Sequence, residues 1–159
     1  MVSLEQEIGE LLRAKKLSLA TVESATGGLI AWMITTVPGS SDYFKGSIVS
    51  YSNQVKIKLA GVKPETLEKH GAVSPQVAGE MAAGGKKALG ADICVSDTGI
   101  AGPGGETPDK PAGLFYIGLA HGRNTMSQKH LFRGDREENR QSAAIAALSW
   151  LRDYLACLK

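Results

Sequence analysis

A turn rich in hydroxyl groups and glycine follows the first β-rich segment of the chain. Ser24 lies there in the run Glu-Ser-Ala-Thr-Gly-Gly at 23–28, directly before a predicted helix. The two glycines permit close backbone approach, and the first turn of a helix offers unpaired amide hydrogens. Such a serine can attack an acyl carbon while the amides stabilise the oxyanion, or the amides can hold a phosphate. Taken alone, the run favours an ordinary capped helix start, which is the commoner role of a serine before a helix.

A serine nucleophile needs a base, and a second segment offers one. Tyr51 ends a predicted strand, and Lys56 follows five residues later on the first turns of a short helix. A lysine can act as the base when burial lowers its pKa, as in Ser-Lys variants of the catalytic triad. A lysine at such a point is more often a solvated surface residue. The histidines are poorer candidates, because His121 falls in a predicted hairpin turn and His130 in a polar strand.

A third segment, 98–113, is long and rich in glycine and proline. Gly99 and Gly104 have the spacing of a phosphate loop, but Gly105 and Glu106 stand where that motif requires lysine and a hydroxyl residue. No helix follows promptly, so the dinucleotide fingerprint fails as well. We therefore exclude a nucleoside triphosphate site, which leaves an anion-binding nest, a lid or a loop without a role.

Basic side chains gather around the start of the last predicted helix. Arg136 and Arg140 are four residues apart and share a helix face, and Arg133 precedes them. They can pair with a phosphate or carboxylate of a ligand, or form a solvated face balanced by Glu137 and Glu138. No cysteine or histidine pair has the spacing of metal ligands, so we expect neither a metal nor a cofactor.

The periodicity of apolar residues predicts the elements that position these segments. Helices are expected at 4–15, 29–37, 54–60 (capped by Asn53), 64–70, 75–89 and 135–157, and strands at 16–23, 47–52, 92–97, 114–120 and 125–132. This order predicts an α/β fold, a three-layer α/β/α sandwich with a mixed, mostly parallel sheet of about five strands, in a single domain over residues 1–159. In such sheets ligands bind beyond the carboxyl ends of strands, where the three segments can converge.

The composition is that of an ordinary globular domain of 159 residues, with 43% hydrophobic residues and a net charge of +2. So small and scattered a charge argues against nucleic acid or a membrane surface as the main partner, and we expect a small ligand. Cys94 and Cys157 are expected to be reduced. The start of the chain has no secretory signal and no apolar run long enough to span a membrane, which predicts a cytoplasmic protein. Its size favours a homodimer or higher homo-oligomer.

Five ordered motifs resemble one family along essentially the whole chain. They are E-S-x-T-G-G at 23–28, Y-S-N-x-x-K at 51–56 with L-x-G-V at 59–62, H-G-A-V-S at 70–74, T-G-I-A-G-P-G-G at 98–105 and G-D-R-x-x-x-R at 134–140. This set is similar to the C-terminal domain of the competence/damage-inducible protein CinA, which also occurs alone as nicotinamide-nucleotide amidase. The sequence departs from the pattern at Asp97, where we expect a small or apolar residue, and at Ala60, where leucine is frequent.

The resemblance implies a CinA-like sandwich that hydrolyses nicotinamide mononucleotide to nicotinate mononucleotide and ammonia, in the recycling of pyridine nucleotides. It implies that Ser24 is the nucleophile and that Lys56 and Tyr51 activate it. The substrate-binding residues that it implies are Thr26, Gly27, Gly28, Asn53, Thr98, Gly99, Arg136 and Arg140, with Arg140 as an anchor for a charged group of the ligand.

Two other functions remain open at this point. The domain can bind the nucleotide as a sensor without turning it over, or it can be an amidase for another small carboxamide. The intact set of Ser24, Tyr51 and Lys56 favours an enzyme over a sensor.

Overall fold

A single five-stranded sheet runs through the protein, for which a computed structural model describes all residues, 1–159. The strand order is β2-β1-β3-β4-β5. β1 pairs in parallel with β2 and β3, whereas the pairs β3–β4 and β4–β5 are antiparallel. The mixed five-stranded sheet predicted from the sequence is therefore confirmed. The strands span Leu19–Glu23 (β1), Phe44–Val49 (β2), Ile93–Gly99 (β3), Leu114–His121 (β4) and Asn124–Leu131 (β5).

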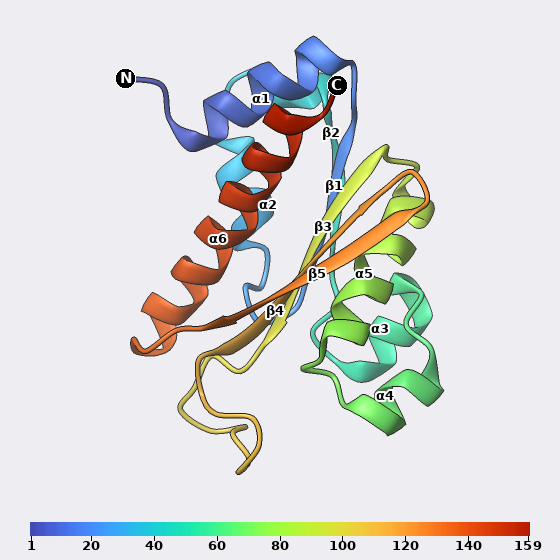
Figure 1. Cartoon of the computed structure of the whole chain (residues 1–159), viewed down its shortest axis with the longest axis vertical. Helices are drawn as coiled ribbons and strands as arrows, with labels where there is room; N and C mark the ends of the chain where they lie inside the picture. Colours follow the sequence, from blue (N-terminus) through green and yellow to red (C-terminus); the bar gives the residue numbers. More distant parts are fainter.

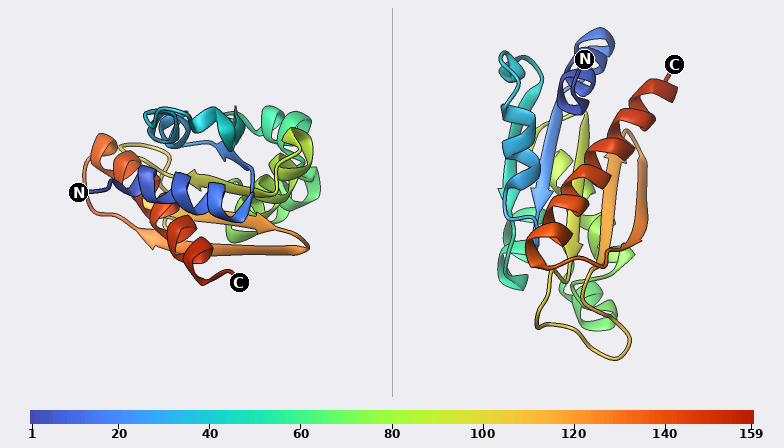
Figure 2. Two further views of the ribbon diagram at one scale, coloured as in Figure 1. Left: turned by 90° about the horizontal axis from the view of Figure 1, so that it is seen from above. Right: turned by 90° about the vertical axis from the view of Figure 1, so that its left-hand side faces the viewer.

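Helices cover both faces of the sheet, as the predicted sandwich requires (Figure 1). α1, α2 and α6 lie on one face, and α3, α4 and α5 lie on the other, which the views in Figure 2 also show. None of these helices combines the length and the apolar character needed to cross a membrane. The helices span Leu4–Lys15 (α1), Leu29–Thr35 (α2), Asn53–Ala60 (α3), Pro64–His70 (α4), Pro75–Leu89 (α5) and Arg136–Cys157 (α6), and a short 3₁₀ turn, η1, spans Ser40–Asp42.

Strand β1 lies at the centre of the two apolar cores and is buried along its whole length. Leu19 belongs to the larger core, which includes Leu12 of α1 and Leu148 of α6. Val22 belongs to the smaller core, which includes Met81 of α5. Because both faces of β1 are covered, the strand holds the residue at its carboxyl end in a fixed place between the layers.

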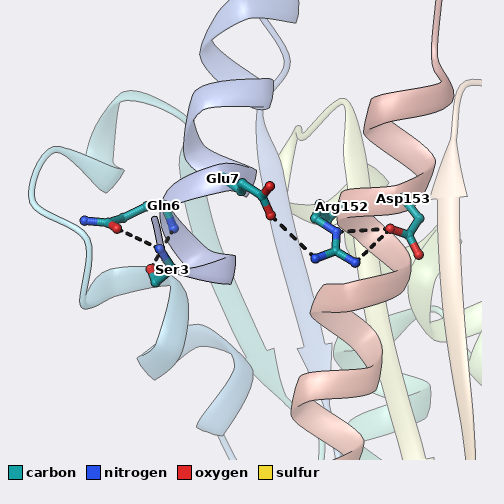
Figure 3. Close-up of polar contacts among 5 residues, drawn as sticks. All are labelled: Ser3, Gln6, Glu7, Arg152 and Asp153. Carbon is teal, nitrogen blue, oxygen red and sulfur yellow. Dashed lines mark hydrogen bonds and ion pairs between the residues drawn. The ribbon is translucent and has the colours of Figure 1, made fainter. Parts of the chain in front are cut away.

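The first and last helices pack side by side at one end of the molecule (Figure 1). α1 begins with a capping box, in which the Ser3 hydroxyl accepts from the Gln6 amide and the Gln6 side chain accepts from the Ser3 amide (Figure 3). Arg152 of α6 reaches Glu7 at 3.5 Å and its neighbour Asp153 at 3.0 Å (Figure 3). These ion pairs are exposed, so the apolar contact between the helices rather than the charges holds them together.

The boundaries of two predicted strands are wrong. The strand predicted from residue 16 begins at Leu19, because Lys16 closes α1 in the left-handed conformation with a φ of 56°. The strand predicted at 47–52 spans Phe44–Val49. After Val49 the chain leaves the sheet, although the Ser50 amide still donates to the Glu23 carbonyl at 2.7 Å.

Two further expectations change near the site. Ser52, and not Asn53, caps α3, since the Ser52 hydroxyl accepts from the Val55 amide at 3.2 Å. β3 continues to Gly99, so Thr98 and Gly99 lie on the strand rather than in the loop that follows it. The other predicted helices and the hairpin agree with the structure within one or two residues.

Glycines let α5 approach its neighbours closely. An added Cβ at Gly84 would lie 1.9 Å from the Ala60 carbonyl oxygen of α3, and one at Gly85 would lie 2.1 Å from Val22 of β1. Both distances are far below van der Waals contact. The two glycines therefore fix how closely α3, which carries Lys56, packs against α5 and the sheet.

We predict that Gly84→Ala lowers the free energy of unfolding by about 1–3 kcal/mol, because the new methyl group meets backbone that cannot move aside freely. Gly79→Ala on the same helix is the control, since its Cβ would meet only a Thr125 methyl group at 3.2 Å. There the gain in helix propensity, about 1 kcal/mol, offsets the contact. Urea denaturation measures both, and equal stability of the two variants would contradict the close packing.

Candidate active site

Ser24 stands at the turn between β1 and α2, directly beyond the carboxyl end of β1. Its side chain is only 7% exposed and lines a cavity at this edge of the sheet. The turn is tightly held, because its backbone groups bond to side chains from three different elements.

The Glu23 carboxylate occupies the start of α2. It accepts hydrogen bonds from the amides of Gly28, Ile30 and Ala31 at 2.9–3.1 Å. These are amides that the first turn of a helix leaves unpaired, and Gly28 at the N-cap has no side chain to bond them. The Gly27 amide bonds within the turn. The expectation that amides near Gly27 and Gly28 hold an oxyanion or a phosphate is therefore wrong, because a carboxylate of the protein takes that place.

Asp97 of β3 holds the same turn from the neighbouring strand. Its carboxyl group accepts from the Ser24 amide at 3.0 Å and from the Thr26 amide at 3.2 Å. Asp97 and Thr26 are fully buried. Burial raises the pKa of Asp97 to about 6, and the nearby charge of Glu23 adds to the increase, although hydrogen bonds from Thr26 and Ser24 oppose it. Asp97, which stands where a small or apolar residue was expected, thus holds the turn at Ser24 and does not line the cavity.

Arg140 of α6 holds the turn from the third side. Its guanidinium donates to the carbonyl oxygens of Ala25 and Thr26 at 3.0 and 3.2 Å. The arginine does not line the cavity. The structure therefore places Arg140 behind the turn, where it fixes the backbone of the two residues that follow Ser24.

Lys56 of α3 reaches Ser24 from across the cavity. Its Nζ lies 2.9 Å from the Ser24 Oγ, 2.7 Å from the Ser50 carbonyl oxygen and 3.2 Å from the Tyr51 carbonyl oxygen. The side chain is 2% exposed and forms no ion pair within hydrogen-bond distance. Burial lowers the pKa of Lys56, and the charge of Asp97 raises it by a smaller amount.

The three partners of Lys56 differ in a way that matters for chemistry. The carbonyl oxygens of Ser50 and Tyr51 can only accept hydrogen bonds, whereas the Ser24 hydroxyl can also donate. A neutral amine has two hydrogens and one lone pair. Its hydrogens match the two carbonyls, so its lone pair faces the Ser24 hydroxyl and can take that proton.

A cavity of about 300 Å³ opens beside this pair. It is bounded by the ends of β1 and β3, by the start of α3 and by the glycine-rich loop that follows β3. Predicted site residues that line it are Ser24, Tyr51, Asn53, Lys56, Thr98, Gly99 and Arg136, whereas Thr26, Gly27, Gly28 and Arg140 lie behind it.

Tyr51 and Arg136 stand together at the open side of the cavity. The Arg136 guanidinium donates to the Tyr51 hydroxyl at 3.3 Å and to the Gly102 carbonyl at 3.0 Å. Tyr51 is 63% exposed, and its hydroxyl bonds neither Ser24 nor Lys56. In this conformation the backbone carbonyl of Tyr51, rather than its phenol, contacts the amine of Lys56.

Several functional groups escaped the sequence analysis because they are backbone groups or act through neighbouring strands. Ala25, next to Ser24, lines the cavity, and its amide donates to no acceptor in the protein. Ala101, Gly102, Gly104 and Gly105 also line the cavity, and their amides are likewise unpaired. Only the glycine content of the loop signalled such a feature. The roles of Glu23 and Asp97 depend on strand pairing and have no local signal.

Comparison with known sequences identifies the same family along almost the whole chain. The family described as the CinA C-terminal domain matches residues 1–155. A CinA-like protein of Chloroherpeton thalassium is 50% identical over 156 residues, which cover 96% of this chain and 37% of that protein. A CinA-like protein of Sulfurihydrogenibium sp. is 47% identical over 154 residues, covering 97% of this chain and 38% of that protein. The chain thus spans little more than a third of the length of these relatives.

Solved structures agree with the sequence match. The competence damage-inducible protein A (ComA) of Klebsiella pneumoniae superposes with a TM-score of 0.95 at 31% identity, covering 98% of this chain and 97% of that one. The competence/damage inducible protein CihA of Agrobacterium tumefaciens gives a TM-score of 0.85 at 37% identity, covering 94% and 96% of the two chains. The sandwich, the motifs and these matches agree: the chain belongs to the CinA C-terminal domain family.

Proposed function

We propose that this chain is a serine amidase that hydrolyses nicotinamide mononucleotide to nicotinate mononucleotide and ammonia. The observation that carries the proposal is the 2.9 Å contact between the Lys56 amine and the Ser24 hydroxyl, in a place where burial lowers the pKa of the lysine. The identity of the substrate rests on the family resemblance.

Acylation begins when the Ser24 Oγ attacks the carboxamide carbon and its proton passes to the neutral Lys56 amine. The resulting tetrahedral oxyanion is stabilised by the unpaired Ala25 amide, which belongs to the residue directly after the nucleophile. When the carbon–nitrogen bond breaks, Lys56 returns the proton to the leaving nitrogen, and ammonia departs. An acyl ester on Ser24 remains.

Deacylation repeats the sequence with water. Lys56, neutral again, takes a proton from a water molecule as that water attacks the ester carbon. The ester bond breaks, the proton returns to the Ser24 oxygen, and the carboxylate product leaves. Each atom and proton is accounted for by substrate, water, Ser24 and Lys56.

The cavity suits a small anionic amide. Its volume of about 300 Å³ lies at the lower end of the range for small-molecule sites. The reacting pair is buried, whereas on another side of the cavity the exposed Arg136 guanidinium donates to the Gly102 carbonyl of the loop 101–105, whose amides are unpaired. A guanidinium and several free amides are suited to a phosphate, so we place the phosphate of the substrate on this side and the carboxamide against Ser24.

Ser24→Ala should lower ammonia release from nicotinamide mononucleotide on the order of 10³-fold or more, with the dissociation constant changed by no more than about threefold. Ser127→Ala, at an exposed position on β5, is the control and should keep full activity. Retained ammonia release in the Ser24 variant would exclude the serine as nucleophile. Tight binding by the wild type without any product would instead support a nucleotide sensor.

Lys56→Met should lower kcat about 10²–10⁴-fold, whereas Lys58→Met, exposed on the same helix, should not. Only the neutral amine accepts a proton, and burial lowers the pKa of Lys56. The wild-type rate should therefore rise with pH along a limb whose midpoint lies below the ordinary pKa of lysine. A pH profile that is unchanged in the Lys56 variant would contradict the role of base.

Arg136→Gln should raise KM for nicotinamide mononucleotide about tenfold or more, because a charge-assisted contact to the phosphate is lost. The loss should be much smaller for nicotinamide riboside, which has no phosphate. Arg133→Gln, at an exposed position outside the cavity, serves as control. Steady-state kinetics on both substrates tests this. An equal rise in KM for the two substrates would show that Arg136 does not contact the phosphate.

A further inference from the structure

Two buried carboxyl groups meet a single hydroxyl beneath the nucleophile turn. The Thr26 Oγ lies 2.7 Å from the Glu23 Oε1 and 2.5 Å from the Asp97 Oδ1. All three side chains are fully buried. A threonine hydroxyl carries one proton and can donate it to only one oxygen. The second contact is a hydrogen bond only if that carboxyl group itself carries a proton, since otherwise two lone pairs face each other without solvent between them.

The two carboxyl groups are not equally suited to hold the proton. Glu23 accepts from three backbone amides, those of Gly28, Ile30 and Ala31, so its oxygens already act as acceptors. Asp97 accepts from two backbone amides only, and burial raises its pKa to about 6. The proton therefore belongs on Asp97, whose carboxyl group donates to the Thr26 oxygen while Thr26 donates to Glu23.

We propose that Glu23 and Asp97 share one proton through the Thr26 hydroxyl, and that Asp97 is thereby a positioning residue which fixes the nucleophile turn and sets the protonation of Lys56. The part concerning Lys56 rests on the proposed function, whereas the shared proton does not. Asp97 touches the backbone of Ser24 and not the cavity, so it acts through Ser24 and Lys56 rather than on the substrate.

The charged groups around the turn explain the link to Lys56. They are Glu23 on β1, Asp97 on β3, Lys56 on α3 and Arg140 on α6, and the guanidinium of Arg140 is bonded to the Ala25 and Thr26 carbonyls. The negative charge of Asp97 raises the pKa of Lys56. When Asp97 keeps its proton, that charge is absent and Lys56 becomes neutral more readily. The protonation of Asp97 and that of Lys56 are therefore coupled, since an ionised Asp97 holds the pKa of Lys56 higher than a protonated Asp97 does.

The shared proton can be measured without any assay of activity. In protein labelled with ¹³C at the aspartate carboxyl groups, one resonance should titrate near pH 6, well above the ordinary aspartate pKa of about 3.9. It should be absent in Asp97→Asn and present in Asp92→Asn, a matched change at the exposed residue directly before the same strand, where Asp92 also accepts from a backbone amide. If every aspartate titrates in the ordinary range or below it, the shared proton is excluded.

Changes at Thr26 test the bridge itself and do not depend on Asp97→Asn folding. Thr26→Val removes the hydroxyl and should shift the midpoint of the elevated resonance, whereas Thr26→Ser keeps the hydroxyl and should leave it in place. Thr21→Val is the control, because the Thr21 hydroxyl contacts Glu23 at 3.3 Å but does not contact Asp97. An elevated resonance that is indifferent to Thr26→Val would show that no proton is shared through this hydroxyl.

The pH profile of amide hydrolysis then tests the positioning role. Asp97→Asn removes the charge that raises the pKa of Lys56, so the acid limb of kcat/KM should move to lower pH, and in Asp92→Asn it should stay. If Asp97→Asn lowers kcat but leaves the acid limb of the pH profile in place, Asp97 has a structural role only. If the wild type releases no ammonia, the proposed function fails, while the ¹³C titration still decides the shared proton.

Discussion

The buried amine of Lys56 is the constraint on which the rest of the site depends. An ammonium group in a dry interior is costly without a nearby anion, and the contacts of this one are two carbonyls and a serine hydroxyl. Burial thus lowers the pKa of this amine. Of its three partners only the Ser24 hydroxyl can also donate a proton, so a neutral amine that donates to the two carbonyls would direct its lone pair at Ser24.

Three elements of the fold hold the turn that carries Ser24. β1 is buried on both faces, β3 supplies the Asp97 carboxyl, and α6 supplies the Arg140 guanidinium. The Glu23 carboxylate accepts from the amides at the start of α2, whereas the Ala25 amide has no acceptor in the protein. The side of the cavity next to Arg136 is built differently, from an exposed arginine and a loop whose amides are unpaired.

Much of this could be predicted from the sequence, because the signals are local. Element boundaries are marked within a few residues by local features. These are Ser3 before the apolar residues of α1, Ser74-Pro75 before α5, and the turn between β4 and β5. Ser24 and Lys56 were found because each follows a strand, and parallel strands end at the same edge of the sheet.

The remainder depended on strand register, which no local pattern contains. Val22 pairs with Ser96, so Glu23 and Asp97 stand at the next position on neighbouring strands. The contact of both carboxyl groups with the Thr26 hydroxyl can be predicted only once that strand pairing is known. For the same reason Arg140 was expected at the ligand, although it reaches the back of the turn.

The central claim, that Lys56 is held neutral against Ser24, is tested most directly by the pKa of that one amine. ¹⁵N NMR titration of the lysine Nζ atoms, with Lys56→Met identifying the resonance and the exposed Lys58 as internal reference, measures it without substrate. We expect the Lys56 amine to titrate below the ordinary lysine pKa, because burial lowers the pKa of Lys56. A Lys56 amine that titrates together with the surface lysines would contradict the account.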